Sequence, residues 1–136
     1  MILGKSAGGN LALVLLRYLH DLRLPLPGKV GMMAPWCDLS MSSGSYDRHK
    51  YFDTLCPPKL ATAVRSAMRW YTPEGAEWFS PALAGDAAWQ WARGVDVYMQ
   101  VGTRELFEDE VVKTARDMRV SGVNVRVREV RLPMIA

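Results

Sequence analysis

The sequence contains little cysteine and no long hydrophobic run. Its two cysteines, Cys37 and Cys56, have no metal-ligand spacing, so we expect them to be reduced, ordinary thiols. No window approaches about 18 uncharged apolar residues, so the sequence predicts no transmembrane helix. The chain opens on the apolar Met1, Ile2 and Leu3, without the basic and then hydrophobic pattern of a signal peptide. We therefore expect a cytoplasmic location.

Histidine and net charge are scarce as well. The formal net charge of +3 is a small excess of Lys and Arg spread along the chain, which does not predict a nucleic-acid partner. A chain of 136 residues that is 49% apolar and 23% charged has the composition of one globular domain at most. The two histidines are His20 and His49. Because His49 lies between Arg48 and Lys50 in a polar loop, we expect it to be solvated rather than to act as a catalytic base.

The most informative stretch is residues 1–12, MILGKSAGGNLA. A short apolar run meets a Gly-rich turn and passes into a helical pattern, so Ser6 lies between a strand and a helix, as in a nucleophile elbow. An elbow needs small residues at the positions of Gly4 and Gly8, because a side chain at either position would collide with the neighbouring strand or helix. The turn would expose the Ser6 hydroxyl. It would also direct the N–H of Ala7 to the same place, where an oxyanion could be stabilised.

A phosphate-binding loop is the alternative reading of this stretch, because such loops also end in Gly-Lys-Ser. That loop needs a further glycine and several flexible residues between the strand and the lysine, so that N–H groups can surround a phosphate. Here the apolar residues 1–3 occupy that space. The pattern therefore favours the elbow.

The remaining pattern predicts an alternation of strands and helices. We expect strands at 29–34, 95–101 and 123–130 and helices at 9–22 and 107–121, with an irregular excursion at 39–92. Strand 95–101 should point its odd-numbered residues inward, and strand 123–130 should have one wetter face, as suits a sheet edge. The strand at 29–34 shows no alternation, so we expect both of its faces to be covered.

Two further features concern packing. We expect helix 9–22 to pack on a sheet through the face made by Leu11, Val14, Leu15, Tyr18 and Leu22. In the excursion, a helix should begin at Pro57 and continue through Met68 and Tyr71. The excursion also contains four tryptophans, which we expect mostly to pack within the excursion: Trp70, Trp78, Trp89 and Trp91.

Several segments together resemble the hormone-sensitive-lipase-like family of α/β-hydrolases. Residues 4–12 (GKSAGGNLA) resemble the family block G-D-S-A-G-G-N-L-A, and residues 34–40 (APWCDLS) resemble S-P-W-x-D-L-S. Residues 79–84 (FSPALA) look like x-S-P-L-x-A, and residues 100–110 (QVGTRELFEDE) are similar to the segment that carries the triad acid. Lys5 departs from the acidic residue usual between Gly and Ser, a position on which the elbow makes no demand.

The resemblance implies a partial α/β-hydrolase fold. We expect about four parallel strands with flanking helices and an excursion between the second and third strands. Residues 1–136 would form a single partial domain that runs from the elbow strand to the last strand. The oxyanion loop H-G-G-G and the segment with the catalytic histidine would lie outside it. Ile2 and Leu3 would then form an unpaired sheet edge that lacks protective charges.

The resemblance also assigns the acid of the triad. The family places it directly after the strand expected at 95–101, where the matching residue is Glu105. A carboxylate there could fix the histidine tautomer and stabilise the imidazolium. Asp109 matches a second acidic position, and its other role would be that of a first-turn helix acid. We favour Glu105.

The implied activity is that of a serine carboxylic-ester hydrolase that forms an acyl-enzyme on Ser6. The resemblance implies a neutral or apolar small-molecule ester as substrate and no metal or organic cofactor, and it leaves the oligomeric state open. The family histidine follows the last strand, and neither His20 nor His49 matches it, so we expect the 136-residue chain itself to be inactive. The alternative is a non-catalytic truncated product or a ligand-binding pseudo-hydrolase.

Overall fold

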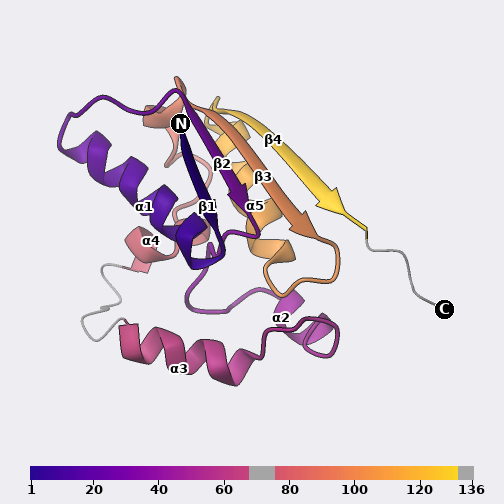
Figure 1. Ribbon diagram of the computed structural model, residues 1–136. Helices are drawn as coiled ribbons and strands as arrows, with labels where there is room; N and C mark the ends of the chain where they lie inside the picture. The colour runs from indigo at the N-terminus through magenta and orange to yellow at the C-terminus, as the bar shows by residue number, and fades with distance from the viewer. Residues whose placement is uncertain (68–75, 132–136) are drawn as a thin grey trace.

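The computed structural model describes residues 1–67 and 76–131 and contains a four-stranded parallel sheet (Figure 1). The strands are β1 (Ile2–Lys5), β2 (Lys29–Met33), β3 (Asp96–Gly102) and β4 (Asn124–Val130), and they lie side by side in that order. All three pairings are parallel, so the four carboxyl ends meet at one edge of the sheet. Ligands of open parallel sheets bind at this edge.

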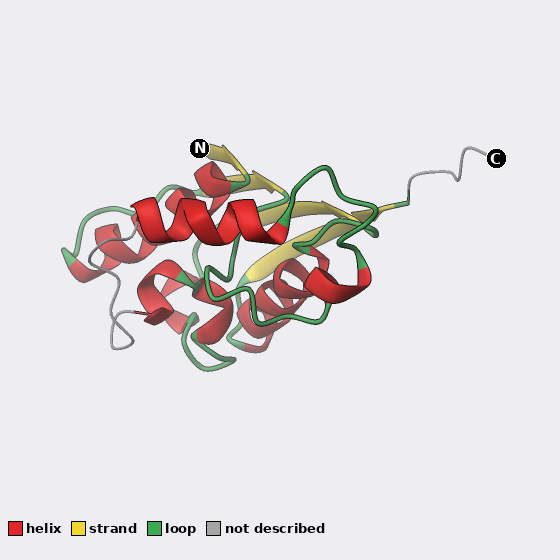
Figure 2. Ribbon diagram, turned by 90° about the horizontal axis from the view of Figure 1, so that it is seen from below, coloured by secondary structure: helices red, strands yellow, loops and turns green. Residues whose placement is uncertain are grey.

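Helices cover one face of the sheet, as Figure 2 shows. The longest are α1 (Ala7–Asp21), α3 (Pro57–Ala67) and α5 (Glu108–Val120). The excursion between β2 and β3 contains α3 together with α2 (Ser45–Arg48), α4 (Ala76–Phe79) and the short 3₁₀ turns η2 (Pro81–Leu83) and η3 (Gln90–Ala92). Among the described residues, every helix is too short or too polar to cross a bilayer.

The predicted fold class is confirmed, with strand boundaries within a residue or so of those expected. In and just before β3, Val95, Val97, Met99 and Val101 are buried, which is the inward alternation that the sequence predicts. Strand β4 lies at the sheet edge and has a wetter face. The expected helix from Pro57 is present as α3, whereas Met68 and Tyr71 lie outside the described residues.

The face predicted for α1 is wrong. The helix packs through Gly9, Ala12, Leu13 and Leu16, whereas Leu11 is 65% and Tyr18 53% exposed. Residues 11–16 are apolar on every side of the helix, so hydrophobic periodicity alone could not identify the packed face. Size decides it instead, because the small Gly9 and Ala12 let the helix approach its neighbours closely.

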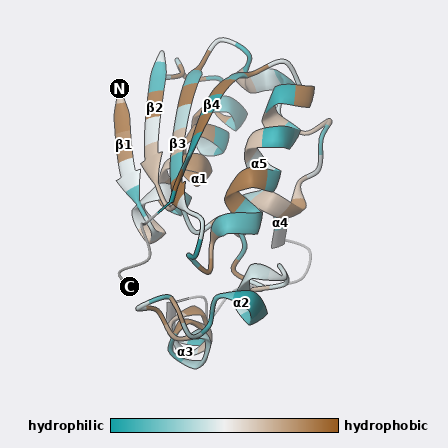
Figure 3. Ribbon diagram, turned by 90° about the vertical axis from the view of Figure 1, so that its right-hand side faces the viewer, coloured by the Kyte–Doolittle hydropathy of each residue, from teal (hydrophilic) through white to brown (hydrophobic). Residues whose placement is uncertain are grey.

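The other face of the sheet is bare among the described residues, which corrects the prediction that both faces of β2 are covered. Leu3 of β1 is 71% exposed and Met33 of β2 is 51% exposed on this face. Val30 and Met32, which point to the helices, are buried. Figure 3 shows β1 at the outer edge of the sheet, with the first part of the strand in the hydrophobic colour. The outer edge of β1 has no partner strand within the described chain.

An unpaired strand beside exposed apolar side chains should make the 136-residue chain self-associate and bind a hydrophobic dye. We expect the double variant Leu3→Glu and Met33→Lys to lower dye fluorescence about several-fold and to shift the protein toward monomer. Val120→Lys is the matched control, because Val120 is 64% exposed but lies on α5. Dye titration and light scattering measure both effects. A monodisperse chain with no dye binding, or an equal response in the control, would contradict this account of the bare face.

Candidate active site

Ser6 occupies a strained turn between β1 and α1. Its backbone has φ 52° and ψ −119°, a left-handed conformation that costs a non-glycine residue about 1–3 kcal/mol. Such strain persists only where the surroundings enforce it, and it concentrates at functional sites. A Cβ at Gly4 would lie 2.3 Å from the carbonyl oxygen of Gly8, so the turn requires glycine at position 4.

The expected collision at Gly8 is absent. A Cβ built at Gly8 has no described heavy atom within 4 Å, whereas one at Gly9 would lie 2.6 Å from the Cβ of Pro35. Gly9 is a buried position of α1, so it is the glycine that meets the segment after β2. The close contact of α1 with its neighbours therefore involves Gly9 and not the predicted Gly8.

Hydrogen bonds hold the Ser6 backbone on both sides. Its N–H donates to the carbonyl of Met33 at 3.0 Å, which extends the pairing of β1 with β2 by one residue. Its carbonyl accepts from the N–H of Trp36 at 3.0 Å and from the N–H groups of Gly9 and Asn10 at 2.9 and 3.1 Å. The turn is thus anchored to β2, to the segment after β2 and to α1.

Ala7 is the first residue of α1. The N–H groups of the first helical turn have no partner within the helix and lie at the positive end of its dipole. Ala7 directly follows Ser6, so its N–H belongs to this first turn. This arrangement can stabilise an anion that forms beside Ser6.

Glu105 lies at the same sheet edge as Ser6. It follows the carboxyl end of β3, and its N–H donates to the Gly102 carbonyl at 3.1 Å. Its half-buried carboxylate accepts the Gly102 N–H at 3.1 Å through Oε2. β1 and β3 are separated only by β2, so their axes are about 10 Å apart. An imidazole is of the right size to join side chains on strands at that spacing.

Asp109 is engaged elsewhere. Its carboxylate accepts two hydrogen bonds from the Arg48 guanidinium, at 2.5 and 3.0 Å, and one from the Ser45 N–H at 2.8 Å. The hydrogen bonds from Arg48 hold the pKa of Asp109 below its usual value. Asp109 therefore fastens α2 to the start of α5, a role that differs from that of Glu105.

Both histidines lie in specific contacts. His20 stacks on Trp91 with ring centroids 4.9 Å apart, near the end of α1 that lies about 20 Å along the axis from Ala7. The Nε2 atom of His49 lies 2.7 Å from Oε2 of Glu108, and the His49 side chain is only 13% exposed. The expectation that His49 is solvated is therefore wrong.

The tryptophans of the excursion pack away from Ser6. Trp89 is buried and contacts Trp91, with ring centroids 5.8 Å apart, and the Arg17 guanidinium lies 5.0 Å above the Trp78 ring. These contacts place them beside the later part of α1, as expected for residues that pack the excursion. Trp70 lies outside the described residues.

A groove of about 300 Å³ lies on the bare sheet face, with Lys29, Asp96 and Tyr98 among its lining residues. Lys29 and Asp96 begin β2 and β3, so this groove is at the amino ends of the strands. Ser6 and Glu105 follow the carboxyl ends. The groove is therefore separate from the candidate site.

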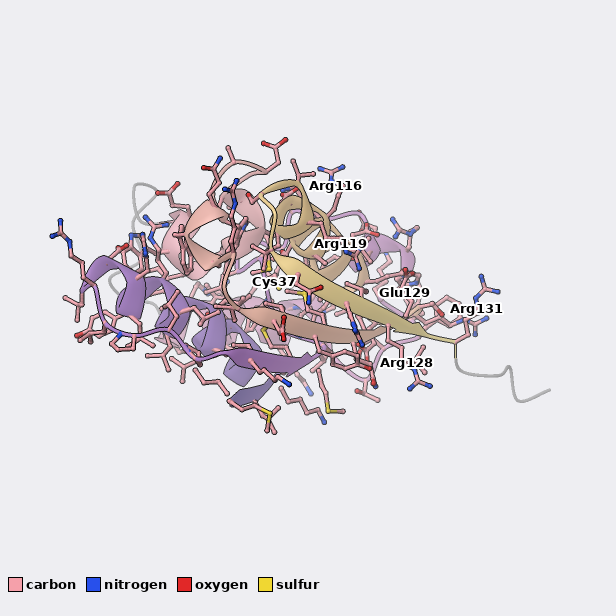
Figure 4. All side chains as sticks on the ribbon, turned by 90° about the horizontal axis from the view of Figure 1, so that it is seen from above. Cys37, Arg116, Arg119, Arg128, Glu129 and Arg131 are labelled. Atoms are coloured by element: carbon pink, nitrogen blue, oxygen red, sulfur yellow. The ribbon has the colours of Figure 1, made fainter. Side chains whose placement is uncertain are left out.

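Sequence reasoning missed a buried polar cluster beneath the segment after β2. Glu110 is 1% exposed, and its carboxyl group accepts the N–H groups of Cys37 at 2.6 Å and Asp38 at 3.2 Å. Burial raises the pKa of the Cys37 thiol, and Figure 4 shows Cys37 inside the fold, whereas Arg128 and Arg131 lie at its periphery. The polar residues Glu110, Thr114 and Asp117 recur at helical spacing on the inward face of α5, a pattern that could have revealed the cluster.

Comparison with known proteins places this geometry in context. A family model described as alpha/beta hydrolase fold matches residues 1–132. A search of curated proteins found no match.

Solved structures of esterases match the fold closely. An esterase from the bacterial hormone-sensitive lipase family is 21% identical, with a TM-score of 0.84 over 98% of this chain and 43% of its own. Carboxyl esterase 2 from the mycorrhizal fungus Tuber melanosporum is 20% identical, with a TM-score of 0.83 over 95% of this chain and 42% of its own. EstE5, in a crystal soaked with p-nitrophenyl butyrate, is 23% identical, with a TM-score of 0.80 over the same two shares. This chain thus spans less than half the length of each.

Proposed function

The chain belongs to the alpha/beta hydrolase fold family, and from that membership we propose that it supplies the nucleophile and the acid of a serine hydrolase that cleaves carboxylic esters. The observation that carries the proposal is the strained conformation of Ser6, at φ 52°, directly before the N-terminus of α1 at Ala7. A hydroxyl and an anion-stabilising N–H on successive residues are what acyl transfer requires.

Each proposed residue has a defined step. The Ser6 Oγ attacks the ester carbonyl carbon while a base removes its proton, and the carbonyl oxygen becomes an oxyanion beside the Ala7 N–H. The bond to the alcohol then breaks, and the alcohol leaves with the proton from the base. Water attacks the acyl group on Ser6 with the same base, which releases the carboxylic acid and restores the hydroxyl.

Glu105 is proposed to orient the base. Its carboxylate would accept the imidazole N–H, fix the tautomer and stabilise the imidazolium. The order β1-β2-β3, in which one strand separates the two that precede Ser6 and Glu105, supports an arrangement with one imidazole ring between these residues. The distance of His20 along α1 and the contact of His49 with Glu108 argue that this imidazole comes from outside the 136 residues.

The positions of the two histidines also favour the second candidate function, a pseudo-hydrolase that binds an ester without turnover. A serine hydroxyl without a base is a poor nucleophile. The two functions differ in whether Ser6 becomes activated when a suitable imidazole is present. An experiment that supplies the remaining segments therefore separates them.

The test uses an extended protein, in which the segments of EstE5 that precede and follow the matched region are joined to residues 1–131. We expect it to hydrolyse p-nitrophenyl butyrate and to be labelled by a fluorophosphonate, whereas the 136-residue chain does neither. A folded extended protein that binds the ester but shows no turnover and no labelling would favour the pseudo-hydrolase. Stoichiometric labelling of the 136-residue chain would instead show that His20 or His49 serves as the base.

A further inference from the structure

Of the buried carboxyl side chains that the proposed chemistry does not use, Glu110 is the least exposed. Glu110 lies in the first turn of α5, and all three of its partners come from the segment that follows β2. Oε1 accepts the N–H groups of Cys37 and Asp38 at 2.6 and 3.2 Å, and Oε2 accepts the Tyr46 hydroxyl at 3.0 Å. A single carboxyl group thus satisfies three donors that are 64 to 73 positions away in the sequence.

The same segment holds Ser6. The N–H of Trp36, one residue before Cys37, donates to the Ser6 carbonyl at 3.0 Å. The Nδ2 atom of Asn10 on α1 donates to the Trp36 carbonyl at 2.8 Å. The Trp36 indole N–H donates to the Tyr46 hydroxyl at 3.1 Å, so Tyr46 and Trp36 connect Glu110 to the backbone of Ser6.

Glu110 is also fixed relative to Glu105. The two are joined by the turn that contains Leu106 and Phe107, whose side chains are buried, and by the start of α5. The Phe107 ring stacks on Trp36 with centroids 5.7 Å apart. Glu105 therefore lies just before α5. Glu110, in the first turn of α5, binds the segment after β2 that is hydrogen-bonded to Ser6.

We propose that Glu110 is a positioning residue that sets the placement of Ser6 relative to Glu105. Its effect on catalysis rests on the proposed function, but its effect on the Ser6 turn does not. Glu110 touches no reacting atom and acts through the backbone of residues 36–38. Loss of its carboxyl group would leave two buried N–H groups without an acceptor and release that segment.

The ionisable groups around Glu110 indicate which substitution preserves this role. Asp38, Cys37 and Tyr46 face the carboxyl group. Burial raises the pKa of Glu110 to about 9, against the opposing effect of its three donors, so the side chain is neutral near pH 7. Glutamine reproduces the neutral shape and keeps an acceptor for both N–H groups, whereas leucine keeps the volume and removes the acceptor.

Hydrogen exchange on the 136-residue chain tests the link to the Ser6 turn. In Glu110→Leu we expect the amide protons of Ser6, Trp36 and Cys37 to exchange about 10-fold faster, with no comparable change in the middle of β3. In Glu110→Gln we expect exchange close to that of the wild type. The control is Asp117→Asn, because Asp117 is 2% exposed on the same helix but pairs with Lys113 and Arg116 instead.

Kinetics of the extended protein test the catalytic consequence. We expect Glu110→Leu to lower kcat for p-nitrophenyl butyrate by about 100-fold with little change in KM, and Glu110→Gln to restore most of it. If Ser6→Ala retains hydrolysis, the proposed function fails, and the exchange result still decides the link between Glu110 and Ser6. Unchanged exchange at Ser6 and Trp36 in Glu110→Leu would overturn the positioning role. So would equal losses of kcat in Glu110→Leu and Asp117→Asn.

Discussion

Ser6→Ala in the extended protein is expected to abolish hydrolysis of p-nitrophenyl butyrate, with a fall in kcat of at least about 10⁴-fold. The reason is chemical, because no acyl-enzyme can form without the hydroxyl. The strained turn itself should persist, since it depends on backbone hydrogen bonds to Met33 and Trp36 rather than on the side chain. Steady-state release of p-nitrophenolate measures the effect.

The control for this prediction is Ser66→Ala, which removes an exposed hydroxyl from α3. It should leave kcat and KM unchanged. Thermal unfolding of all three proteins should show similar transitions, so that a loss of activity reports on chemistry. Retention of more than about a tenth of the wild-type kcat by Ser6→Ala would contradict the role of Ser6.

The second large effect is expected for Glu105→Gln, which should lower kcat by about 10²- to 10⁴-fold. The amide would keep the size of the side chain but would lose the charge that stabilises an imidazolium. The measurement is kcat as a function of pH. An imidazole without a carboxylate partner has a different pKa, so the pH dependence of kcat should change together with its maximal value.

Asp109→Asn is the matched comparison for Glu105→Gln, four residues further along the chain. It should lower kcat by less than about 10-fold, because the Asp109 carboxylate already binds Arg48 and the Ser45 N–H. Its main expected effect is looser attachment of α2 to α5. A severe loss in Asp109→Asn together with a mild one in Glu105→Gln would reverse the assignment of the acid.

The strand–turn–helix geometry around Ser6 and the positions of the strands along the chain could be predicted from the sequence because local rules determine them. Ser6 lies between an apolar run and a helical pattern, and Gly4 is required by the close approach of the Gly8 carbonyl. The alternation from Val95 to Val101 similarly matches the buried positions of β3. These features depend on neighbours in the chain, so the pattern of residue types contains them.

The parts that could not be predicted depend on contacts between distant residues. Which side of α1 packs is decided by its neighbours in space, because residues 11–16 offer apolar groups in every direction. The crowding at Gly9 arises from Pro35, on the far side of the β1–α1–β2 unit. The spacing of polar residues on α5 can indicate that Glu110 faces inward, but its partners Cys37 and Tyr46 lie too far along the chain for a local pattern to identify them.

The bare sheet face also shows where local reasoning ends. The absence of alternation in β2 predicts cover on both sides, yet among the described residues only the side with Val30 and Met32 is covered. A strand without alternation is typical of a parallel sheet that is covered on both faces. An exposed Leu3 and Met33 are consistent with a chain that spans less than half the length of the esterases it matches.

The most direct test of the central claim is to identify the residue that the fluorophosphonate modifies in the extended protein. Peptide mass spectrometry should find one adduct per chain, on the peptide that contains Ser6, and the Ser6→Ala protein should carry none. Labelling should slow in parallel with kcat in Glu105→Gln, since both need an activated hydroxyl. An active extended protein whose adduct lies on any residue other than Ser6 would contradict the account.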